Sequence, residues 1–184
     1  MTRDSELRQQ VQLAIPLAAQ QLGFQVMGTV DALVLGRYDE SALAAAGVGN
    51  NLLFAITAIG MGIILGLDTV IPQAIGAGKH EAARRYLAAG IRLSILVGLL
   101  ATLFVIASPL VLRFTDIAPE VRSQAELYVH LRALGVVPFL LSIALKSYLA
   151  ARTVTRPLVI AVVGANIVNL ALDFLLIFGA GPIP

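Results

Sequence analysis

The sequence predicts an all-α polytopic membrane protein, on three observations. Of its 184 residues, 58% are hydrophobic and only 13% are charged, whereas soluble domains carry about 25% charged residues. The apolar residues gather into five runs, each long enough to cross a bilayer as a helix. Ionisable side chains within these runs are few. We therefore expect five transmembrane helices and little water-exposed structure.

The predicted spans follow one another through short polar connections. Residues 1–10 are polar and predict a short lead-in on the cytoplasmic side. The amino-terminal transmembrane part is expected to cover residues 11–184. Its spans are placed at about 11–36, 41–75, 93–112, 125–150 and 157–179.

Prolines and glycines mark features of the first two spans. Pro16 stands near the start of the first span, where a missing backbone N–H costs least. In the second span, Gly62 and Gly66 form a GxxxG pair that predicts close helix packing. Gly76 and Gly78 are expected to end this helix as C-cap glycines.

The later spans differ in polarity. The segment KHEAARRYLAAGIR predicts a basic amphipathic connection before the uncharged third span. The fourth span is less apolar, and we place its Arg132 and Lys146 near the two ends, where long side chains reach the interface. The linker ARTVTR then leads into the fifth span.

The distribution of basic residues favours a cytoplasmic N-terminus. With that orientation the inner segments hold eight Lys and Arg residues, namely Arg3, Arg8, Lys79, Arg84, Arg85, Arg92, Arg152 and Arg156. The outer loops hold three, namely Arg37, Arg113 and Arg122. Cytoplasmic segments of membrane proteins are enriched in these residues. We expect an integral protein of a prokaryotic inner membrane.

Two acids lie inside predicted spans at matching depth. Asp31 precedes the end of the first span by five residues, and Asp173 precedes the end of the fifth span by six. At 1.5 Å rise per residue, both lie roughly 8–9 Å below the outer boundary. Because the first and fifth spans run in the same direction, we expect the two carboxylates to share one site. Ionisable groups inside spans usually serve a transported ion or a proton.

Two amides join Asp173 on one face of the fifth span. Asn166, Asn169 and Asp173 fall within roughly 60° of arc on a helix. Asn169 lies one turn from Asp173 and is expected to ligate or hydrogen-bond, so Asp31, Asn169 and Asp173 offer a possible Na⁺ site. A hydrogen bond between helices explains Asn166 equally well, and we give this residue a supporting role.

The first span presents a matching stripe of residues. Gln20, Phe24, Met27 and Asp31 follow one another at helical spacing. Aromatic and thioether groups beside an acid suit a cavity that accepts varied organic cations. Plain helix packing also explains this stripe, and a structural polar partner also explains either acid.

Two other polar residues have simpler explanations. Asp68 lies about two turns from the inner end of the second helix, and we expect it to pair with a basic loop residue. His130 lies close to the outer interface, where a solvated or capping histidine is expected.

Composition and motifs argue against several classes of protein. The net charge of +2 follows the topology and indicates no nucleic-acid patch. With no cysteine and two histidines, neither a disulfide framework nor a zinc site is expected. Gln73 and His80 replace the glycine and the Ser or Thr of a phosphate loop. We expect no enzyme, and no cofactor beyond H⁺ or Na⁺ as a coupling ion.

Three segments resemble the multidrug and toxic compound extrusion (MATE) family. They are VMGTVDALVLGRYDESALAAAGVGN, GLDTVIPQAIGAGKHEAARRYLAAGIR and ARTVTRPLVIAVVGANIVNLALDFLLIFG, in the family's order, and they cover most of the chain. The resemblance implies five transmembrane helices of a six-helix lobe of a twelve-helix transporter. It further implies that a sixth span and a carboxy-terminal lobe of the same chain complete the protein.

The resemblance extends to the acids. An acid in the first span and an Asn-x-x-x-Asp in the fifth are similar to the DinF-like branch, where they line a site that couples H⁺ or Na⁺ to drug export. Asp31, Asn169 and Asp173 match those positions. A proline often follows the fifth-span acid in archaeal relatives, and Phe174 stands here instead.

We therefore expect a secondary active antiporter, embedded in membrane lipid, that exports small organic cations by alternating access. Protonation of the acids would remove the charge that holds the substrate. A lipid-linked oligosaccharide flippase is an alternative, disfavoured because Arg132 and Lys146 are placed near span ends. An intramembrane aspartyl protease is disfavoured because neither Asp31 nor Asp173 stands in a Tyr-Asp or Gly-x-Gly-Asp motif. A non-transporting membrane scaffold stays open.

Overall fold

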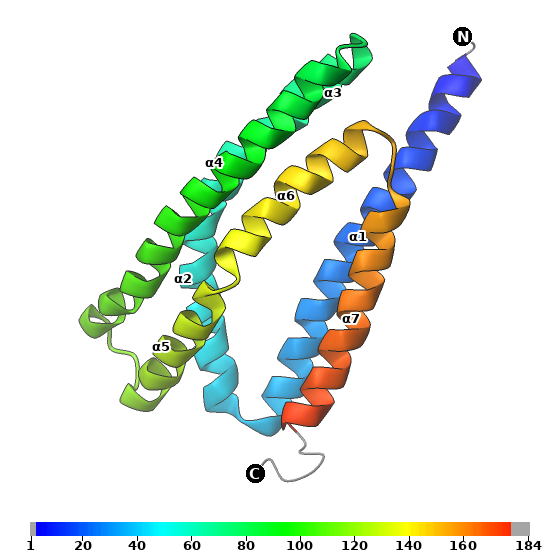
Figure 1. Ribbon diagram of the computed structural model, residues 1–184. Helices are drawn as coiled ribbons and strands as arrows, with labels where there is room; N and C mark the ends of the chain where they lie inside the picture. Colours follow the sequence, from blue (N-terminus) through cyan, green and yellow to red (C-terminus); the bar gives the residue numbers. More distant parts are fainter. Residues whose placement is uncertain (1–2, 178–184) are drawn as a thin grey trace. The chain divides into compact units, whose positions relative to one another are not determined.

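The structure, a computed structural model, describes residues 3–177, and these residues form helices without any strand (Figure 1). They divide into two units, which we describe separately. Unit 1 contains α1 (Arg3–Tyr38) and α7 (Arg156–Ile177), and unit 2 runs from Ser41 to Arg152. Residues 1–2 of the predicted lead-in and residues 178–179 of the predicted fifth span lie outside the described residues.

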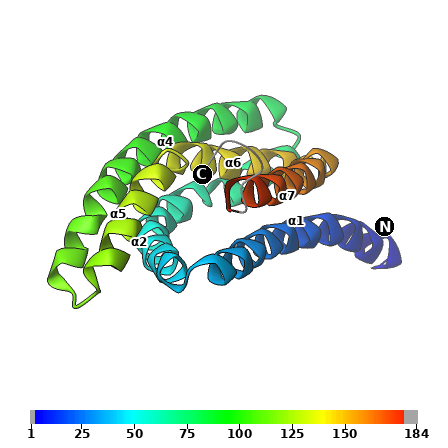
Figure 2. The same cartoon turned by 90° about the horizontal axis from the view of Figure 1, so that it is seen from below.

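In unit 1, α1 and α7 run side by side in both ribbon views (Figures 1 and 2). The predicted lead-in is not separate from the first span, because one continuous helix begins at Arg3. Pro16 is accommodated inside that helix.

Unit 2 is built from six helical elements. In chain order these are α2 (Glu40–Ile64), α3 (Leu67–Gly76), α4 (His80–Ala107), the 3₁₀ helix η1 (Ser108–Phe114), α5 (Pro119–Ala133) and α6 (Val136–Ala151). The helix α4 packs along α6, and α3 contacts both of them.

The helices of three predicted spans differ from the expected continuous helices. The second span is broken after Ile64 into α2 and α3. The third begins at His80 rather than at 93, because its Ala- and Arg-rich basic segment is itself a good helix former. The fourth consists of α5 and α6, which meet at a bend of 47°.

Glycines let the helices of unit 2 approach closely. A Cβ on Gly98 of α4 would lie 3.1 Å from the backbone Cα of Val137 in α6. A Cβ on Gly60 would lie 3.1 Å from Leu140. Within the described part of unit 2 a Cβ on Gly62 would meet nothing within 4 Å, so the predicted role of the GxxxG pair stays a prediction. Small residues do pack this unit, but at other positions than that motif indicated.

The turn after α3 confirms the C-cap role predicted for Gly78 but not for Gly76, which is the last residue of the helix. Gly78 adopts a φ of +71°, a conformation that few other residues reach at low cost. Its N–H donates to the carbonyl of Ile75 over 2.9 Å, and the N–H of Lys79 donates to that of Ala74 over 2.9 Å. These two bonds form a Schellman motif.

The structure also identifies partners for Asp68 and His130. Asp68 accepts a hydrogen bond from the hydroxyl of Ser147 in α6, so the predicted pairing with a basic loop residue was wrong. The Nε2 atom of His130 lies 3.3 Å from the carbonyl oxygen of Ile106, in the last turn of α4. The predicted capping role of this histidine is confirmed.

Helices long and apolar enough to cross a membrane confirm the predicted class of protein. Three stretches in the described residues qualify, namely Glu40–Gly76, His80–Phe114 and Arg156–Asp173. A fourth qualifies if α5 and α6 count as one bent span. The predicted first span lies in α1, which is more polar because it carries Gln20, Gln21, Gln25 and Asp31. The count of five spans stays a prediction.

Candidate functional site

The contact between α1 and α7 depends on Gly23. A Cβ at this position would overlap the side chain of Val162 and would lie 3.5 Å from the amide nitrogen of Asn166. The missing side chain therefore lets the two helices pack closely. It also fixes their register, because Gly23 of α1 lies level with the turn between Val162 and Asn166.

In the same helix pair Asp31 and Asp173 lie near each other, and their predicted role as one shared site stays a prediction. The two carboxyl groups lie close enough for like-charge repulsion, and for a side-chain hydrogen bond when one of them carries a proton. Both side chains are half-buried. One oxygen of each, Oδ1 of Asp31 and Oδ2 of Asp173, is enclosed without a hydrogen-bond partner. These oxygens retain lone pairs that can accept a proton or ligate a cation.

A second feature of unit 1 is a pocket of about 270 Å³ lined by Gln20 and Asn166. Gln20 is 6% exposed, and its Oε1 has no hydrogen-bond partner. The Nδ2 of Asn166 donates to the carbonyl of Val162 in its own helix over 2.8 Å. Sequence reasoning placed Gln20 in the Asp31 stripe but missed its proximity to Asn166, because that depends on the register of two helices.

Three other predicted site residues of unit 1 do not line this pocket. Asn169 is half-buried, one turn before Asp173 on α7. Phe24 is 48% exposed and Met27 is half-buried, and neither lines the Gln20 pocket. The predicted roles of these three residues stay predictions. Within residues 3–177 no three or more His, Cys, Asp or Glu side chains lie so that they could hold one metal ion, so a Na⁺ ion would rely on two carboxylates and neutral oxygens.

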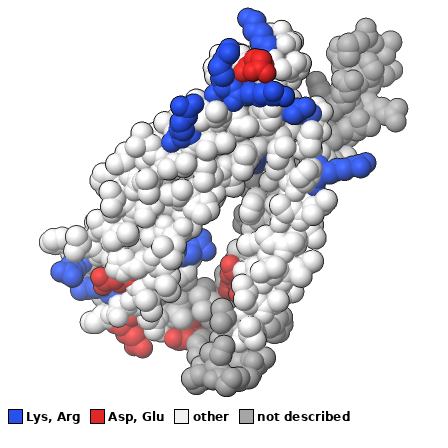
Figure 3. All heavy atoms as spheres, viewed as in Figure 1, with Lys and Arg blue, Asp and Glu red and all other residues white. Residues whose placement is uncertain are grey.

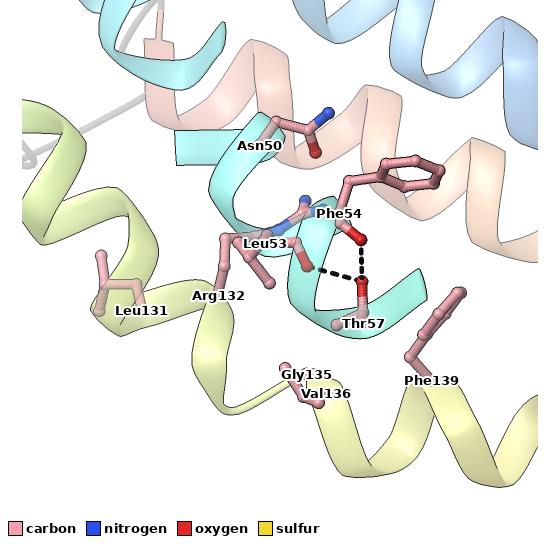
Figure 4. A pocket seen from close by; sticks show the side chains of 9 residues that line it. All are labelled: Asn50, Leu53, Phe54, Thr57, Leu131, Arg132, Gly135, Val136 and Phe139. Carbon is pink, nitrogen blue, oxygen red and sulfur yellow. Dashed lines mark hydrogen bonds between the residues drawn. The ribbon is translucent and has the colours of Figure 1, made fainter. Parts of the chain in front are cut away.

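Unit 2 contains a larger pocket, of about 440 Å³, at the break between α5 and α6 (Figure 4). Its polar lining residues include Asn50 from α2 and Arg132 from α5. In the close-up, Arg132 extends toward the turn of α2 that carries Leu53 and Phe54 (Figure 4).

Arg132 lies in the last turn of α5, directly before the break to α6. Its predicted position near an end of the membrane span stays a prediction. From Pro119 it is about 20 Å along α5, and about 28 Å of helix follow it. The signal for this break in the sequence was Gly135 followed by Pro138, a pair that often interrupts a membrane helix. Lys146, in the last two turns of α6, does lie near an end.

Comparison with known proteins gives a consistent result. The MatE family model matches residues 16–175. The chain is 33% identical over 97% of its length to a protein of Bradyrhizobium diazoefficiens called "Probable multidrug resistance protein NorM". It is 26% identical over 98% of its length to a Synechocystis protein of the same name. It is 29% identical over 95% of its length to "Multidrug resistance protein PmpM" of Pseudomonas aeruginosa.

The match covers most of this chain but not of its relatives. The chain spans 38% of the Bradyrhizobium protein, 39% of the Synechocystis protein and 37% of the Pseudomonas protein. No solved structure gave a significant match. Because the family model covers most of the sequence, the chain belongs to the MatE family, as its resemblance to multidrug and toxic compound extrusion proteins predicted.

Proposed function

We propose that the protein carrying this chain is a transporter, not an enzyme, and exports organic cations in exchange for H⁺ or Na⁺. The observation that carries the proposal is the contact between Asp31 and Asp173 on two helices of unit 1. Two carboxylates that repel each other inside membrane helices are stabilised when a proton, a metal cation or an organic cation binds between them. These ligands then compete for one site.

Competition of this kind is the basis of exchange. If the coupling ion and the substrate cannot occupy the acids together, ion entry drives substrate release. Alternating access would then expose the acids to each side of the membrane in turn. In this proposal Asn169 ligates or hydrogen-bonds beside Asp173, Asn166 supports α7, and the remaining lobe of the protein completes the transport path.

The charges of unit 2 support the proposed cytoplasmic N-terminus. Lys and Arg gather at the end where α3 meets α4, whereas acidic and basic groups are mixed toward the other end (Figure 3). The basic end carries Lys79, Arg84, Arg85 and Arg92, with Glu81 paired to Arg84 over 3.3 Å. Segments rich in Lys and Arg tend to stay in the cytoplasm, which supports a cytoplasmic position for this end.

A lipid-linked oligosaccharide flippase stays the second candidate. Sequence analysis disfavoured it because both intramembrane cations, Arg132 and Lys146, were placed near span ends. The antiporter is now preferred on the paired acids and on the MatE family match. The two classes are distinguished by whether a small organic cation is exported.

The experiment is an efflux assay on cells that express the full protein encoded by the gene containing this sequence. Cells are loaded with ethidium, and dye loss is followed with an imposed pH gradient, an imposed Na⁺ gradient or neither. We expect one of the gradients to accelerate efflux severalfold above that of cells without the protein. A well-expressed protein whose cells lose dye no faster under either gradient would rule out cation-coupled export.

A further inference from the structure

We propose that a pocket between α4 and α6, at the basic end of unit 2, binds the phosphate group of an anionic phospholipid. The inference goes beyond the proposed export function, because it concerns a lipid held by unit 2 and not the compound that is exported. The pocket has a volume of about 290 Å³ and is lined by Ile75, His80, Ala83, Arg84, Tyr148 and Arg152, all of which belong to unit 2.

The first argument is the level of this pocket along the two helices. α4 and α6 pack side by side in opposite directions (Figure 1). The hydroxyl of Ser94 in α4 donates to the carbonyl of Leu140 in α6 over 3.3 Å, so these two residues lie at one level. Counting eight residues toward the basic end on each helix, from 94 to 86 and from 140 to 148, places Tyr86 level with Tyr148. Tyrosines are enriched where membrane helices leave the lipid, so this pair indicates the membrane interface.

The length of α4 agrees with an interface at this level. From Tyr86 to Ile106 the helix rises about 30 Å, which is the thickness of the hydrocarbon layer. Arg92 lies within that distance, but its Nε donates over 3.2 Å to a backbone carbonyl one turn back, so its side chain runs toward the basic end. Arg84 and Arg152 lie beyond the tyrosines by two and four residues, about 3–6 Å, on the side away from the lipid chains. This is the layer of the phospholipid headgroups.

The second argument is the set of hydrogen-bond donors in the pocket. His80 and Arg84 lie one turn apart on α4, and Arg152 follows the last residue of α6. Guanidinium groups bind phosphate oxygens through paired N–H groups, and a histidine ring donates an N–H in either tautomer. Among residues 3–177, neither His80 nor Arg152 forms an ion pair. Donors from both helices are therefore available to one phosphate group.

The two arginines retain most of their capacity to bind an anion. Nη1 of Arg84 lies 3.3 Å from Oε1 of Glu81, but both side chains are mostly exposed, and ion pairs of this kind contribute little. The other N–H groups of that guanidinium remain for a phosphate. The guanidinium carbon of Arg152 lies 5.8 Å from the centroid of the Tyr148 ring, a contact that leaves its N–H edge open to an anion.

The third argument is the apolar part of the lining, which favours a lipid over a free phosphate ion. Ile75 and Ala83 line the pocket together with Tyr148, and Ala83 is almost fully buried. A phosphate ion gains nothing from these groups, whereas the glycerol and first methylene groups of a phospholipid bury apolar surface against them. Basic pockets between membrane helices bind phospholipid headgroups in other membrane proteins.

The test is a competition assay on the purified full protein in detergent. The probe is a phosphatidylglycerol with a fluorophore at the end of one acyl chain, and its fluorescence anisotropy is followed as unlabelled lipids of identical chains are added. We expect phosphatidylglycerol to displace the probe at least tenfold more effectively than phosphatidylcholine, whose headgroup has no net charge. The Arg84→Gln, Arg152→Gln double variant should bind the probe at least tenfold more weakly, about 1.4 kcal/mol. The Arg84→Lys, Arg152→Lys double variant should retain most of the affinity.

Lys79→Gln, Arg85→Gln is the matched control, because it removes the same charge from the same end of unit 2 but neither residue lines the pocket. It should change the affinity for the probe by less than threefold. Equal weakening in the two Gln double variants would mean that the basic end attracts lipid as a whole, and would overturn the proposed site. Equal displacement by phosphatidylcholine would overturn it too. So would displacement by millimolar inorganic phosphate beyond that caused by sodium chloride of the same ionic strength, which would indicate a site for a free anion.

Chemical modification of the wild type covers the case in which the arginine variants do not fold. Phenylglyoxal modifies accessible arginines, and the extent of modification at each arginine is read by peptide mass spectrometry. Phosphatidylglycerol should protect Arg84 and Arg152 from the reagent severalfold more than phosphatidylcholine does, while the exposed Arg85 reacts equally with either lipid present. Equal modification of Arg84 and Arg152 with the two lipids would exclude a bound anionic headgroup in this pocket.

Discussion

Replacing Asp173 by Asn is expected to reduce gradient-driven efflux to the level of cells without the protein. The change keeps the size of the side chain but removes its charge and its ability to exchange a proton. It also removes the repulsion with Asp31 that a proton or cation relieves. The measurement is the initial rate of ethidium efflux, normalised to the amount of protein in the membrane.

Asp68→Asn is the control for this variant. Asp68 is also an acid within a membrane-spanning stretch, but it lies in unit 2 and accepts a hydrogen bond from Ser147, a bond that an Asn oxygen can also accept. It should retain most of the wild-type rate. Wild-type efflux from Asp173→Asn at normal expression would remove Asp173 from the site.

Gly98→Leu is expected to destabilise the protein strongly. A Cβ at this position would lie 3.0 Å from the Cγ2 of Val137 and 3.1 Å from its Cα, so the clash involves backbone that cannot turn aside. Separating α4 from α6 costs about 3 kcal/mol on the scale of overpacked cores. The apparent melting temperature of the purified protein should fall by about 6–12 °C.

Gly62→Leu is the matched substitution, because a Cβ there would meet no described atom within 4 Å. We expect its melting temperature to stay within about 2 °C of the wild type, a surface-like effect of under 0.5 kcal/mol. If both variants melt alike, the packing assigned to Gly98 is wrong.

The helical class and the pairing of Asp31 with Asp173 could be predicted because both follow from short-range rules. Apolar runs predict helices, and two acids near the ends of parallel spans must fall at similar depth. The C-cap at Gly78 was equally local, because a left-handed turn strongly favours glycine. The C-cap needed only the sequence around one helix end, and the acid pair needed only the position of each acid within its own helix.

The features that were missed depend on how helices meet. The GxxxG motif named Gly62 as a contact, but Gly60 and Gly98 face the neighbouring helix. Each residue along a helix points about 100° away from the one before it, and the motif alone does not say which face of the helix meets a neighbour. The bend between α5 and α6 was missed because one continuous span was assumed there.

The central claim is that coupling ion and substrate compete for Asp31 and Asp173, and an equilibrium titration of the purified full protein tests it most directly. Binding of ethidium is measured across a range of pH and of Na⁺ concentrations, for the wild type and for the Asp31→Asn, Asp173→Asn double variant. The account predicts an apparent Kd that rises about tenfold per tenfold increase in one of the two ions, and no such dependence in the double variant. A wild-type Kd that is independent of both ions, or a dependence that persists in the variant, would contradict it.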